Sequence, residues 1–172
     1  MANTAYPVLE LVLHNIRSAH NVGALFRTAD GLGVTHIYLS GYTPYPAGDS
    51  DLRLPHIARK TTAAIAKTAL GAEETVGWSK HDRLSDVALL VSKQATQLVA
   101  LEQSPVAEKL QNYQPAKKIA LVLGNEVTGL NSDELAICQE IIELPMLGNK
   151  ESFNVASAGA MALHWLRYYQ KI

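Results

Sequence analysis

The 172-residue sequence has a single cysteine, Cys138, so no disulfide can form within the chain. A lone cysteine fits a reducing compartment, and we expect a small buried side chain rather than a reactive thiol. No apolar run reaches the roughly 18 residues that suggest a membrane-spanning helix. The N-terminus also lacks the basic and then apolar segments of a signal peptide. The sequence therefore predicts a cytoplasmic protein with no membrane partner.

Excess charge and the common nucleotide and metal motifs are also missing. The formal net charge is −1, so any nucleic-acid-binding surface must be local. No GxGxxG follows the first expected strand and no GxxxxGK(S/T) occurs, which removes the main support for dinucleotide and P-loop sites. The six histidines show no HxxxH or HExxH spacing. We therefore expect no metal site.

Hydrophobic residues make up 48% of the chain and charged residues 18%, a balance typical of one globular domain, which we place at residues 1–172. Apolar β-prone segments alternate with helical ones, which predicts an α/β fold with a mainly parallel sheet and helices on both faces. The expected strands are Val8–Leu13, Thr35–Leu39, Thr75–Trp78, Gln97–Leu101, Ile119–Gly124 and Ile141–Leu144. The expected helices are Asn21–Leu32, Ile57–Leu70, Asp82–Gln94, Ser132–Cys138 and Asn154–Tyr168.

The one long expected loop is GYTPYPAGDSDLRLPH, residues 41–56, and basic residues follow it. Loops of this length inside a domain are often functional. Arg53, Arg59, Lys60 and Lys67 fall within fifteen positions of one another. Such a cluster fits an RNA-binding surface and an ordinary solvated surface about equally well.

The segment NIRSAHNVGALFRTAD, residues 15–30, combines a core helix with polar residues that need an explanation. Apolar residues recur at the i, i+3, i+4 and i+7 positions of a helix, namely Val22, Leu25, Phe26 and Ala29. Arg27 projects roughly opposite this apolar face, and Asn21 stands near the helix start beside Arg17 and His20. These polar residues either cap and solvate the helix, a role in which Asn21 would serve well as N-cap, or point into a site.

Two later segments stand out beside this one, LVLGNEVTGL at 121–130 and ELPMLGNKESFNVASAGAMALHWL at 143–166. In this order and at these separations, the three segments resemble the signatures of the SpoU/TrmH branch of the SPOUT methyltransferases. The intervening KTALGAEETVGW and LVALEQSP look similar too, so the resemblance covers nearly the whole chain. It implies an S-adenosylmethionine-dependent enzyme that methylates ribose 2′-hydroxyls of tRNA or rRNA. It also implies a deep C-terminal trefoil knot, a rare exception to unknotted topology.

The resemblance further implies a cofactor pocket at strand ends. Backbone groups beyond the strands would read the adenine edges, and glycine would permit close approach. The implied cofactor-binding residues are Leu101, Gly124, Leu144, Met146, Ser152 and Phe153. Without the flanking loops, the two leucines would be interpreted as plain core residues. The family usually has leucine where this chain has Phe153, which puts the shape of the pocket near the adenine in question.

The implied catalytic residues are Arg27, Asn21, Glu126, Ser152 and Asn154. Deprotonating a guanidinium at pH 7 costs about 8 kcal/mol, so Arg27 is better suited to stabilising a developing alkoxide than to acting as a general base. Glu126 would orient Arg27 or Asn21. The alternative interpretation of Glu126 is a solvated turn residue. Ser152 and Asn154 would alternatively cap the last helix.

The resemblance implies RNA as the partner and a homodimer that pairs through the first and last helices. The late cluster Met161, Leu163, Trp165, Leu166, Tyr168 and Tyr169 is apolar on more sides than one surface helix needs, although a fully buried monomeric helix gives the same pattern. The candidate RNA-binding residues are Arg17, Arg53, Arg59 and Lys60. Two rival functions stay open, namely a catalytically silent RNA-binding module and a SPOUT enzyme that methylates a base.

Overall fold

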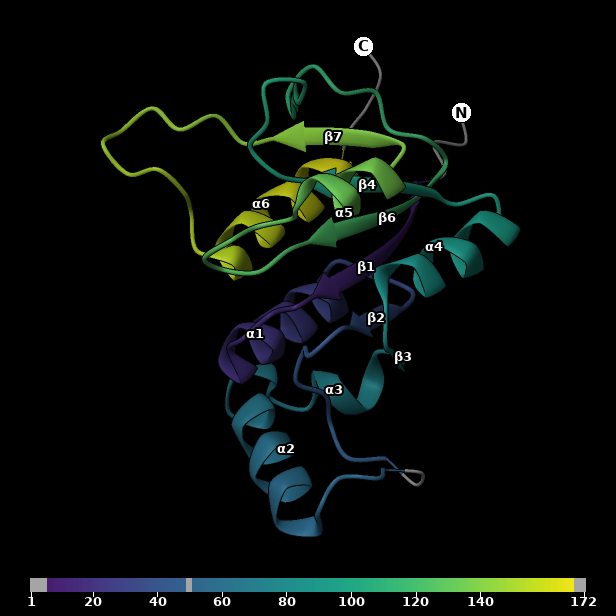
Figure 1. Ribbon diagram of the computed structural model, residues 1–172, viewed down its shortest axis with the longest axis vertical. Coiled ribbons are helices and arrows are strands. Elements are labelled where there is room, and N and C mark those ends of the chain that lie inside the picture. The colour runs from purple at the N-terminus through teal and green to yellow at the C-terminus, as the bar shows by residue number, and fades with distance from the viewer. Residues whose placement is uncertain (1–5, 49–50, 169–172) are drawn as a thin grey trace.

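The computed structural model describes residues 6–48 and 51–168, and this part of the chain contains a seven-stranded, all-parallel sheet (Figure 1). The strand order is β3-β2-β1-β6-β4-β7-β5. The strands are β1 (Val8–His14), β2 (Ile37–Ser40), β3 (Trp78–His81), β4 (Gln97–Leu101), β5 (Glu108–Lys109), β6 (Lys118–Leu123) and β7 (Glu140–Glu143). Because the strands are parallel, their carboxyl ends meet at one edge, where open α/β sheets place their ligand sites.

Helices cover both faces of this sheet. They are α1 (Ala19–Gly31), α2 (Pro55–Ala69), α3 (Ala72–Thr75), α4 (Leu84–Lys93), α5 (Ser132–Ile137) and α6 (Val155–Tyr168). Buried side chains of α1, α2 and α6 share one hydrophobic core with the sheet, and those of α4 form a second core on the other face, with α5 packed against it. In Figure 1, α2 extends beyond the β3 end of the sheet. No helix within the described ranges is long and apolar enough to cross a membrane.

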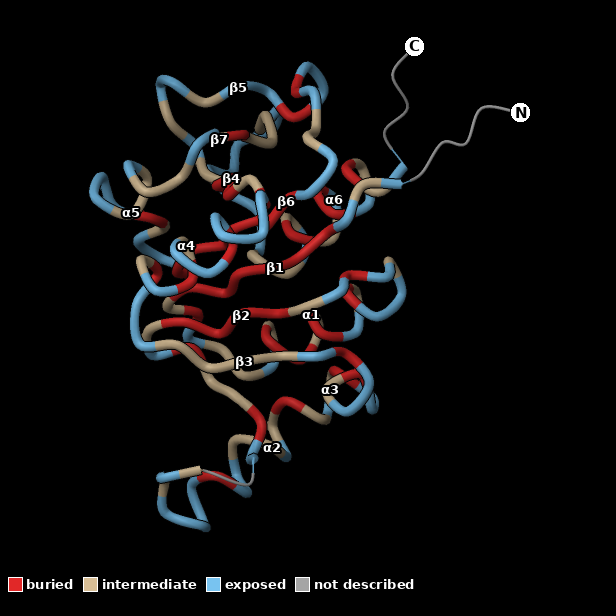
Figure 2. Tube along the Cα trace, turned by 90° about the vertical axis from the view of Figure 1, so that its right-hand side faces the viewer, coloured by how far each residue is buried: buried red, intermediate tan, exposed pale blue. Residues whose placement is uncertain are grey.

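The central strands are buried on both faces, which explains their nearly continuous apolar sequences. Along β1, Leu9, Leu11 and Leu13 belong to the core on the α1 side, while Val12 belongs to the core on the α4 side. Figure 2 shows the same for neighbouring strands, since β1, β2 and β6 are largely red, the colour of buried residues. The expected α/β class, parallel sheet and two helical layers are therefore confirmed. The trefoil knot stays a prediction.

Most expected elements are present with their ends displaced by a few residues, and β4 has the expected bounds. The strand expected at Thr75–Trp78 is wrong. Residues 72–75 form α3, and β3 begins only at Trp78. Val76 is apolar because it packs into the core just after α3, not because it belongs to a strand. The sequence also missed α3 and β5, since four and two residues are too few to set up a periodic pattern.

Cys138 behaves as expected for a structural cysteine. It is partly buried at the end of α5, and its Sγ donates to the carbonyl oxygen of Glu134 at 3.6 Å. Burial, together with the nearby Glu134 carboxylate, raises the pKa of the Cys138 thiol to about 12. The thiol therefore stays protonated and unreactive at neutral pH.

Glu10 in β1 is a carboxyl group that the fold buries in its core. It is 7% exposed, and its Oε2 is buried without a hydrogen-bond partner in the described structure. Burial raises the Glu10 pKa, against the lowering effects of a hydrogen bond from Tyr38 and the charge of Lys118. A folded-state pKa above the unfolded one means that the stability contribution is present below the ordinary value of 4.5 and is lost as pH rises through the folded-state pKa.

Glu10→Gln removes this charge, so we expect the free energy of unfolding to rise by about 1 kcal/mol at pH 8 and by much less at pH 4. Urea denaturation at the two pH values measures the difference. Glu108→Gln, an exposed carboxyl on β5, serves as the control and should change neither value. A gain of equal size at both pH values would contradict the assignment to Glu10 ionisation.

Candidate active site at the carboxyl edge of the sheet

Glu126, in the loop after β6, holds the start of α1. Its Oε2 accepts the backbone N–H of Arg17 at 2.8 Å, while its Oε1 accepts the backbone N–H of Ser18 at 3.0 Å and Nδ2 of Asn21 at 2.9 Å. Burial alone would raise the Glu126 pKa, but these hydrogen bonds outweigh it and hold that pKa below its ordinary value. Glu126 is therefore ionised at neutral pH and fixed in direction.

Asn21 connects this carboxylate to the last helix. Its Oδ1 accepts a hydrogen bond from Nδ2 of Asn154 at 3.2 Å. The Oδ1 of Asn154 in turn accepts the backbone N–H groups of Ala156 and Ser157 at 2.9 and 3.3 Å, so Asn154 also caps α6. Three of the expected catalytic residues thus form one hydrogen-bonded chain across segments more than a hundred residues apart.

The alternative interpretation of Asn21 as a helix N-cap is wrong. Ser18 occupies that position, and its hydroxyl accepts the backbone N–H of Asn21 at 3.3 Å. The helix therefore begins before the expected start, and the Asn21 side chain is available for Glu126 and Asn154. Of the two partners expected for Glu126, the structure places Asn21 in contact with it.

Asn125 fixes the loop that carries Glu126. It is 8% exposed, and its Nδ2 donates to the carbonyl oxygen of Asn15 at 3.0 Å and to the hydroxyl of Tyr42 at 2.7 Å. Its Oδ1 accepts the backbone N–H groups of Val127 and Thr128 at 2.8 and 3.0 Å. Sequence reasoning did not select Asn125, although an amide directly after a buried strand and before Glu126 is a signal for such a loop anchor.

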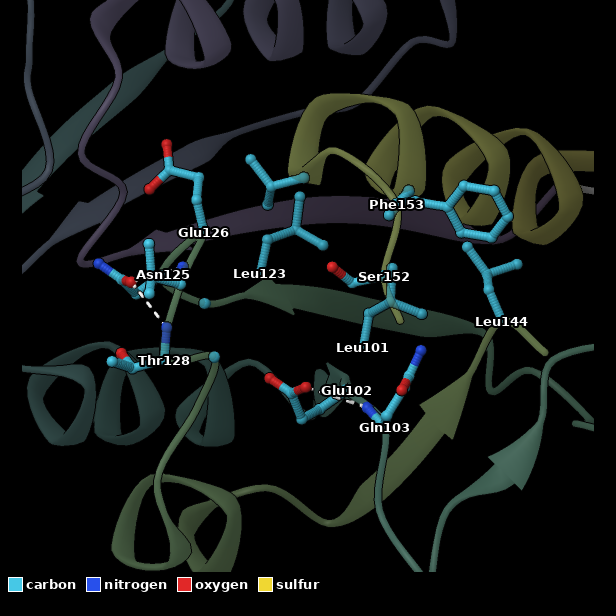
Figure 3. A pocket seen from close by; sticks show the side chains of 15 residues that line it. Leu101, Glu102, Gln103, Leu123, Asn125, Glu126, Thr128, Leu144, Ser152 and Phe153 are labelled. Atoms are coloured by element: carbon cyan, nitrogen blue, oxygen red, sulfur yellow. Dashed lines mark hydrogen bonds between the residues drawn. The ribbon is translucent and has the colours of Figure 1, made fainter. Parts of the chain in front are cut away.

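Beside this network, the carboxyl ends of β4, β6 and β7 enclose a cavity of about 220 Å³ (Figure 3). The expected site residues that line it are Leu101, Gly124, Glu126, Leu144, Ser152 and Phe153. Figure 3 shows Phe153 and Leu144 at one end of the cavity and Asn125, Glu126 and Thr128 at the other. The cavity thus combines an apolar end with a polar one that adjoins the Asn21 network.

Gly124 lies in close contact with the loop at residues 129 and 130. A Cβ atom at this position would lie 2.8 Å from the carbonyl carbon of Gly129 and 2.8 Å from Cγ of Leu130. Real packing does not tolerate such distances, so a side chain here must displace the loop around residues 129 and 130. Glycine therefore fits at position 124 because there is no space for a side chain, and a larger residue should distort the cavity wall.

We expect Gly124→Ala to weaken S-adenosylmethionine binding by about tenfold or more, because overpacking of this size costs one to several kcal/mol. Isothermal titration calorimetry measures the affinity. Gly31→Ala, at the end of α1 where an added Cβ meets nothing within 4 Å, is the matched control and should bind normally. Equal affinity for the two variants would contradict this account of Gly124.

Among the expected catalytic and cofactor-binding residues, Met146 and Arg27 belong neither to the cavity lining nor to the Asn21 network. Met146, in the loop after β7, is half-buried but does not line the cavity. Arg27 is exposed and borders a separate groove with Asp30 and residues of the α2–α3 junction. The guanidinium of Arg27 takes part in none of the hydrogen bonds or ion pairs of the described residues. The cavity of a single chain therefore lacks the arginine that the motif implies.

Arg53 is engaged by its own loop. Its guanidinium lies 3.5 Å from the centroid of the Tyr45 ring, and its Nη2 pairs with Oδ2 of Asp51 at 2.5 Å. The hydrogen bonds with Asp51 raise the pKa of Arg53 further. A phosphate would have to compete with Asp51 for this side chain, which weakens the case for Arg53 as an RNA contact. The remaining expected RNA-binding residues are exposed, namely Arg17, Arg59 and Lys60.

Comparison with known proteins identifies the family. The model of the SpoU rRNA Methylase family matches residues 8–164. The tRNA (guanosine(18)-2′-O)-methyltransferase of Escherichia coli is 27% identical over 158 residues, which cover 92% of this chain and 62% of that protein. The 23S rRNA (guanosine-2′-O-)-methyltransferase RlmB of Bordetella pertussis is 28% identical over 158 residues, 92% of this chain and 58% of that protein.

The fold also has close counterparts among solved structures. The AdoMet-bound rRNA methyltransferase from Sinorhizobium meliloti superimposes with a TM-score of 0.76 at 21% identity, covering 95% of this chain and 57% of that one. At this identity the likeness supports the fold alone. The chain spans about three fifths of the length of the curated relatives that it matches.

Proposed function

The chain belongs to the SpoU rRNA methylase family, as its three motifs predict, and we propose that it transfers a methyl group from S-adenosylmethionine to a ribose 2′-hydroxyl of RNA. The observation that carries this proposal is the junction of Asn21, Glu126 and Asn154 beside a cavity lined by the expected cofactor residues. By their names, the two relatives act on guanosines of tRNA and of 23S rRNA, so these RNA classes are the substrates to test first.

The cavity fits the chemistry of this cofactor. Leu101, Leu144 and Phe153 supply an apolar surface suited to the adenine, and the bare backbone of Gly124 allows close approach to the strand end. When bound, S-adenosylmethionine supplies an electrophilic methyl group on a sulfonium. The remaining tasks belong to the protein, which must hold the ribose in line, exclude water and stabilise the charge that develops on the ribose oxygen.

The hydrogen bonds among Glu126, Asn21 and Asn154 indicate which residues position the ribose. Glu126 fixes the amide of Asn21 with Nδ2 toward the carboxylate and Oδ1 toward Asn154. We assign Asn21 and Asn154 to positioning the ribose, with Ser152 at the wall of the cavity. Arg27 then supplies the positive charge that stabilises the developing alkoxide.

We propose a homodimer, because the cavity of one protomer lacks Arg27 and a second copy packed on α1 and α6 would bring that residue to it. On α6, Leu163 and Leu166 are buried in the protomer's own core, while Met161 is 40% and Tyr168 52% exposed. Fewer apolar side chains of α6 are therefore exposed than the sequence suggests. Tyr169 lies outside the described residues. Sedimentation at micromolar concentration tests this proposal, which a clean monomer would contradict.

Methyl transfer can be tested on total tRNA and rRNA with a cofactor that carries a radiolabelled methyl group. A methylated ribose blocks alkaline cleavage at its 3′ side, so we expect the label in alkali-resistant dinucleotides. Label in alkali-sensitive mononucleotides would indicate a base methyltransferase. Cofactor binding without any transfer would indicate a silent RNA-binding module. DNA of matched sequence, which has no 2′-hydroxyl, is the negative control. We also propose a cytoplasmic location, which fits the single unpaired thiol.

A further inference from the structure

Glu102 follows β4 directly, and its carboxylate forms part of the cavity wall. Its Oε2 accepts the backbone N–H of Leu130 at 2.8 Å, and its Oε1 accepts the backbone N–H of Gln103 at 3.0 Å. Gly129, at a φ of +64°, passes so close that a Cβ atom there would lie 2.3 Å from Oε2. These hydrogen bonds hold the Glu102 carboxylate between β4 and the loop after β6, at the cavity wall.

The cavity wall is acidic. Two lining residues, Glu102 and Glu126, carry carboxylates, and no lysine, arginine or histidine is among the residues that line the cavity. Each Glu102 oxygen accepts only one hydrogen bond from the described residues, so lone pairs remain for a ligand. A charge held at a partly closed cavity acts over several ångströms because the surrounding protein screens it less than water does.

The donor and the product of the proposed reaction differ in charge more than in shape. S-adenosylmethionine carries a sulfonium, and after transfer the same sulfur is a neutral thioether. We infer that Glu102, together with Glu126, makes the cavity select the cationic donor over its neutral demethylated product. This inference rests on the proposed function. Its consequence is that loss of the sulfonium charge favours release of the spent cofactor.

Titration calorimetry of both ligands on the wild-type protein and on Glu102→Gln tests this inference. We expect the ratio of product Kd to donor Kd to fall by about fivefold in the variant, because one of two nearby negative charges is gone. An analogue with an amine in place of the methylated sulfur is also cationic and should follow the donor. Glu140→Gln removes an exposed carboxylate at the amino end of β7, away from the cavity, and should leave the ratio unchanged.

A purely structural role for Glu102 gives a different result. Glutamine has one oxygen acceptor fewer, so a loosened loop would weaken both ligands alike and leave their ratio unchanged, which would overturn the inference. Glu102→Asp keeps the charge and should restore the wild-type ratio even if both affinities change. If the wild-type protein methylates RNA and only the ratio fails to move, this inference alone falls. If the wild-type protein binds no cofactor, the proposed function falls as well.

Discussion

Replacing Arg27 by alanine is expected to lower the rate of methyl transfer by at least about a hundredfold, the usual loss when one preorganised charge donor is removed from a developing oxyanion. The affinity for S-adenosylmethionine should stay within about twofold of wild type, because Arg27 does not line the cofactor cavity. Its exposed guanidinium also contributes no described hydrogen bond, so the fold should tolerate the change. Radiolabel transfer, titration calorimetry and thermal melting measure the three quantities.

Arg83→Ala is a matched control, since Arg83 is an exposed arginine at the start of α4, which packs on the other face of the sheet, and its side chain caps nothing. It should leave transfer at the wild-type rate. Persistent turnover in Arg27→Ala would remove Arg27 from the reaction. A large loss of cofactor affinity in that variant would instead place Arg27 in the binding site.

Mixed dimers test how Arg27 reaches a cavity that it does not line in its own protomer. Consider a dimer of one Arg27→Ala chain and one Asn154→Ala chain. If Arg27 of each chain acts at the cavity of the other chain, this dimer contains one site in which both residues are intact. An equal mixture of the two variants, with subunits exchanged at random, should then recover about one quarter of wild-type activity. If Arg27 serves its own protomer, every site in the mixture lacks one residue and no activity returns.

The main architecture was predictable because burial of the central strands leaves a strong pattern in the sequence. The run of residues 119–123 is apolar at every position since β6 is covered on both faces. Signals of that kind do not exist for α3 or β5. The strand predicted at 75–78 is wrong because Val76 is apolar for another reason. It ends the short helix α3 and packs into the core.

Residues of the candidate site could be proposed where a motif carries its own spacing, whereas the contacts among them depend on the fold and could not be predicted. Asn21, Glu126 and Asn154 were identified through the family resemblance, yet no sequence pattern shows that they bond to one another across more than a hundred residues. The position of Glu102 at the cavity could not be predicted, because it depends on how closely the loop at Gly129 packs against its carboxylate. Arg53 was predicted to contact RNA because it belongs to a basic cluster, and its stacking on Tyr45 could not be foreseen because that contact depends on the loop conformation.

Glu126→Gln is expected to lower methyl transfer by about a hundredfold, because small misplacements of positioning residues are costly in rate. The wild-type carboxylate accepts N–H groups from Arg17, Ser18 and Asn21 on its two oxygens. A glutamine of the same size must turn its own NH2 toward at least one of these donors. The Asn21 amide then loses its fixed direction toward Asn154, or the start of α1 shifts.

The same substitution should lower the free energy of unfolding by about 1.5 kcal/mol at pH 7, the lower end of the range for hydrogen bonds to a charged acceptor, because the three donors are exposed or only partly buried. Glu74→Gln, an exposed carboxyl in α3, is the control for loss of a glutamate charge and should have little effect. Urea denaturation gives the stability, and the radiolabel assay on the same samples gives the rate. Normal transfer by a folded Glu126→Gln protein would remove Glu126 from the positioning network.

The dependence on pH separates the charge of Glu126 from its shape. Burial pushes its pKa upward, but the three donors more than reverse this, so the folded-state pKa lies below the ordinary glutamate value of 4.5. A lowered pKa contributes stability that is fully present above pH 4.5 and is lost as the pH falls through the folded-state value. The stability gap between wild type and Glu126→Gln should therefore be largest near neutral pH and shrink below pH 4. If the stability difference stays constant down to pH 3, the contribution of Glu126 does not depend on its ionisation, and its negative charge is not what stabilises the fold.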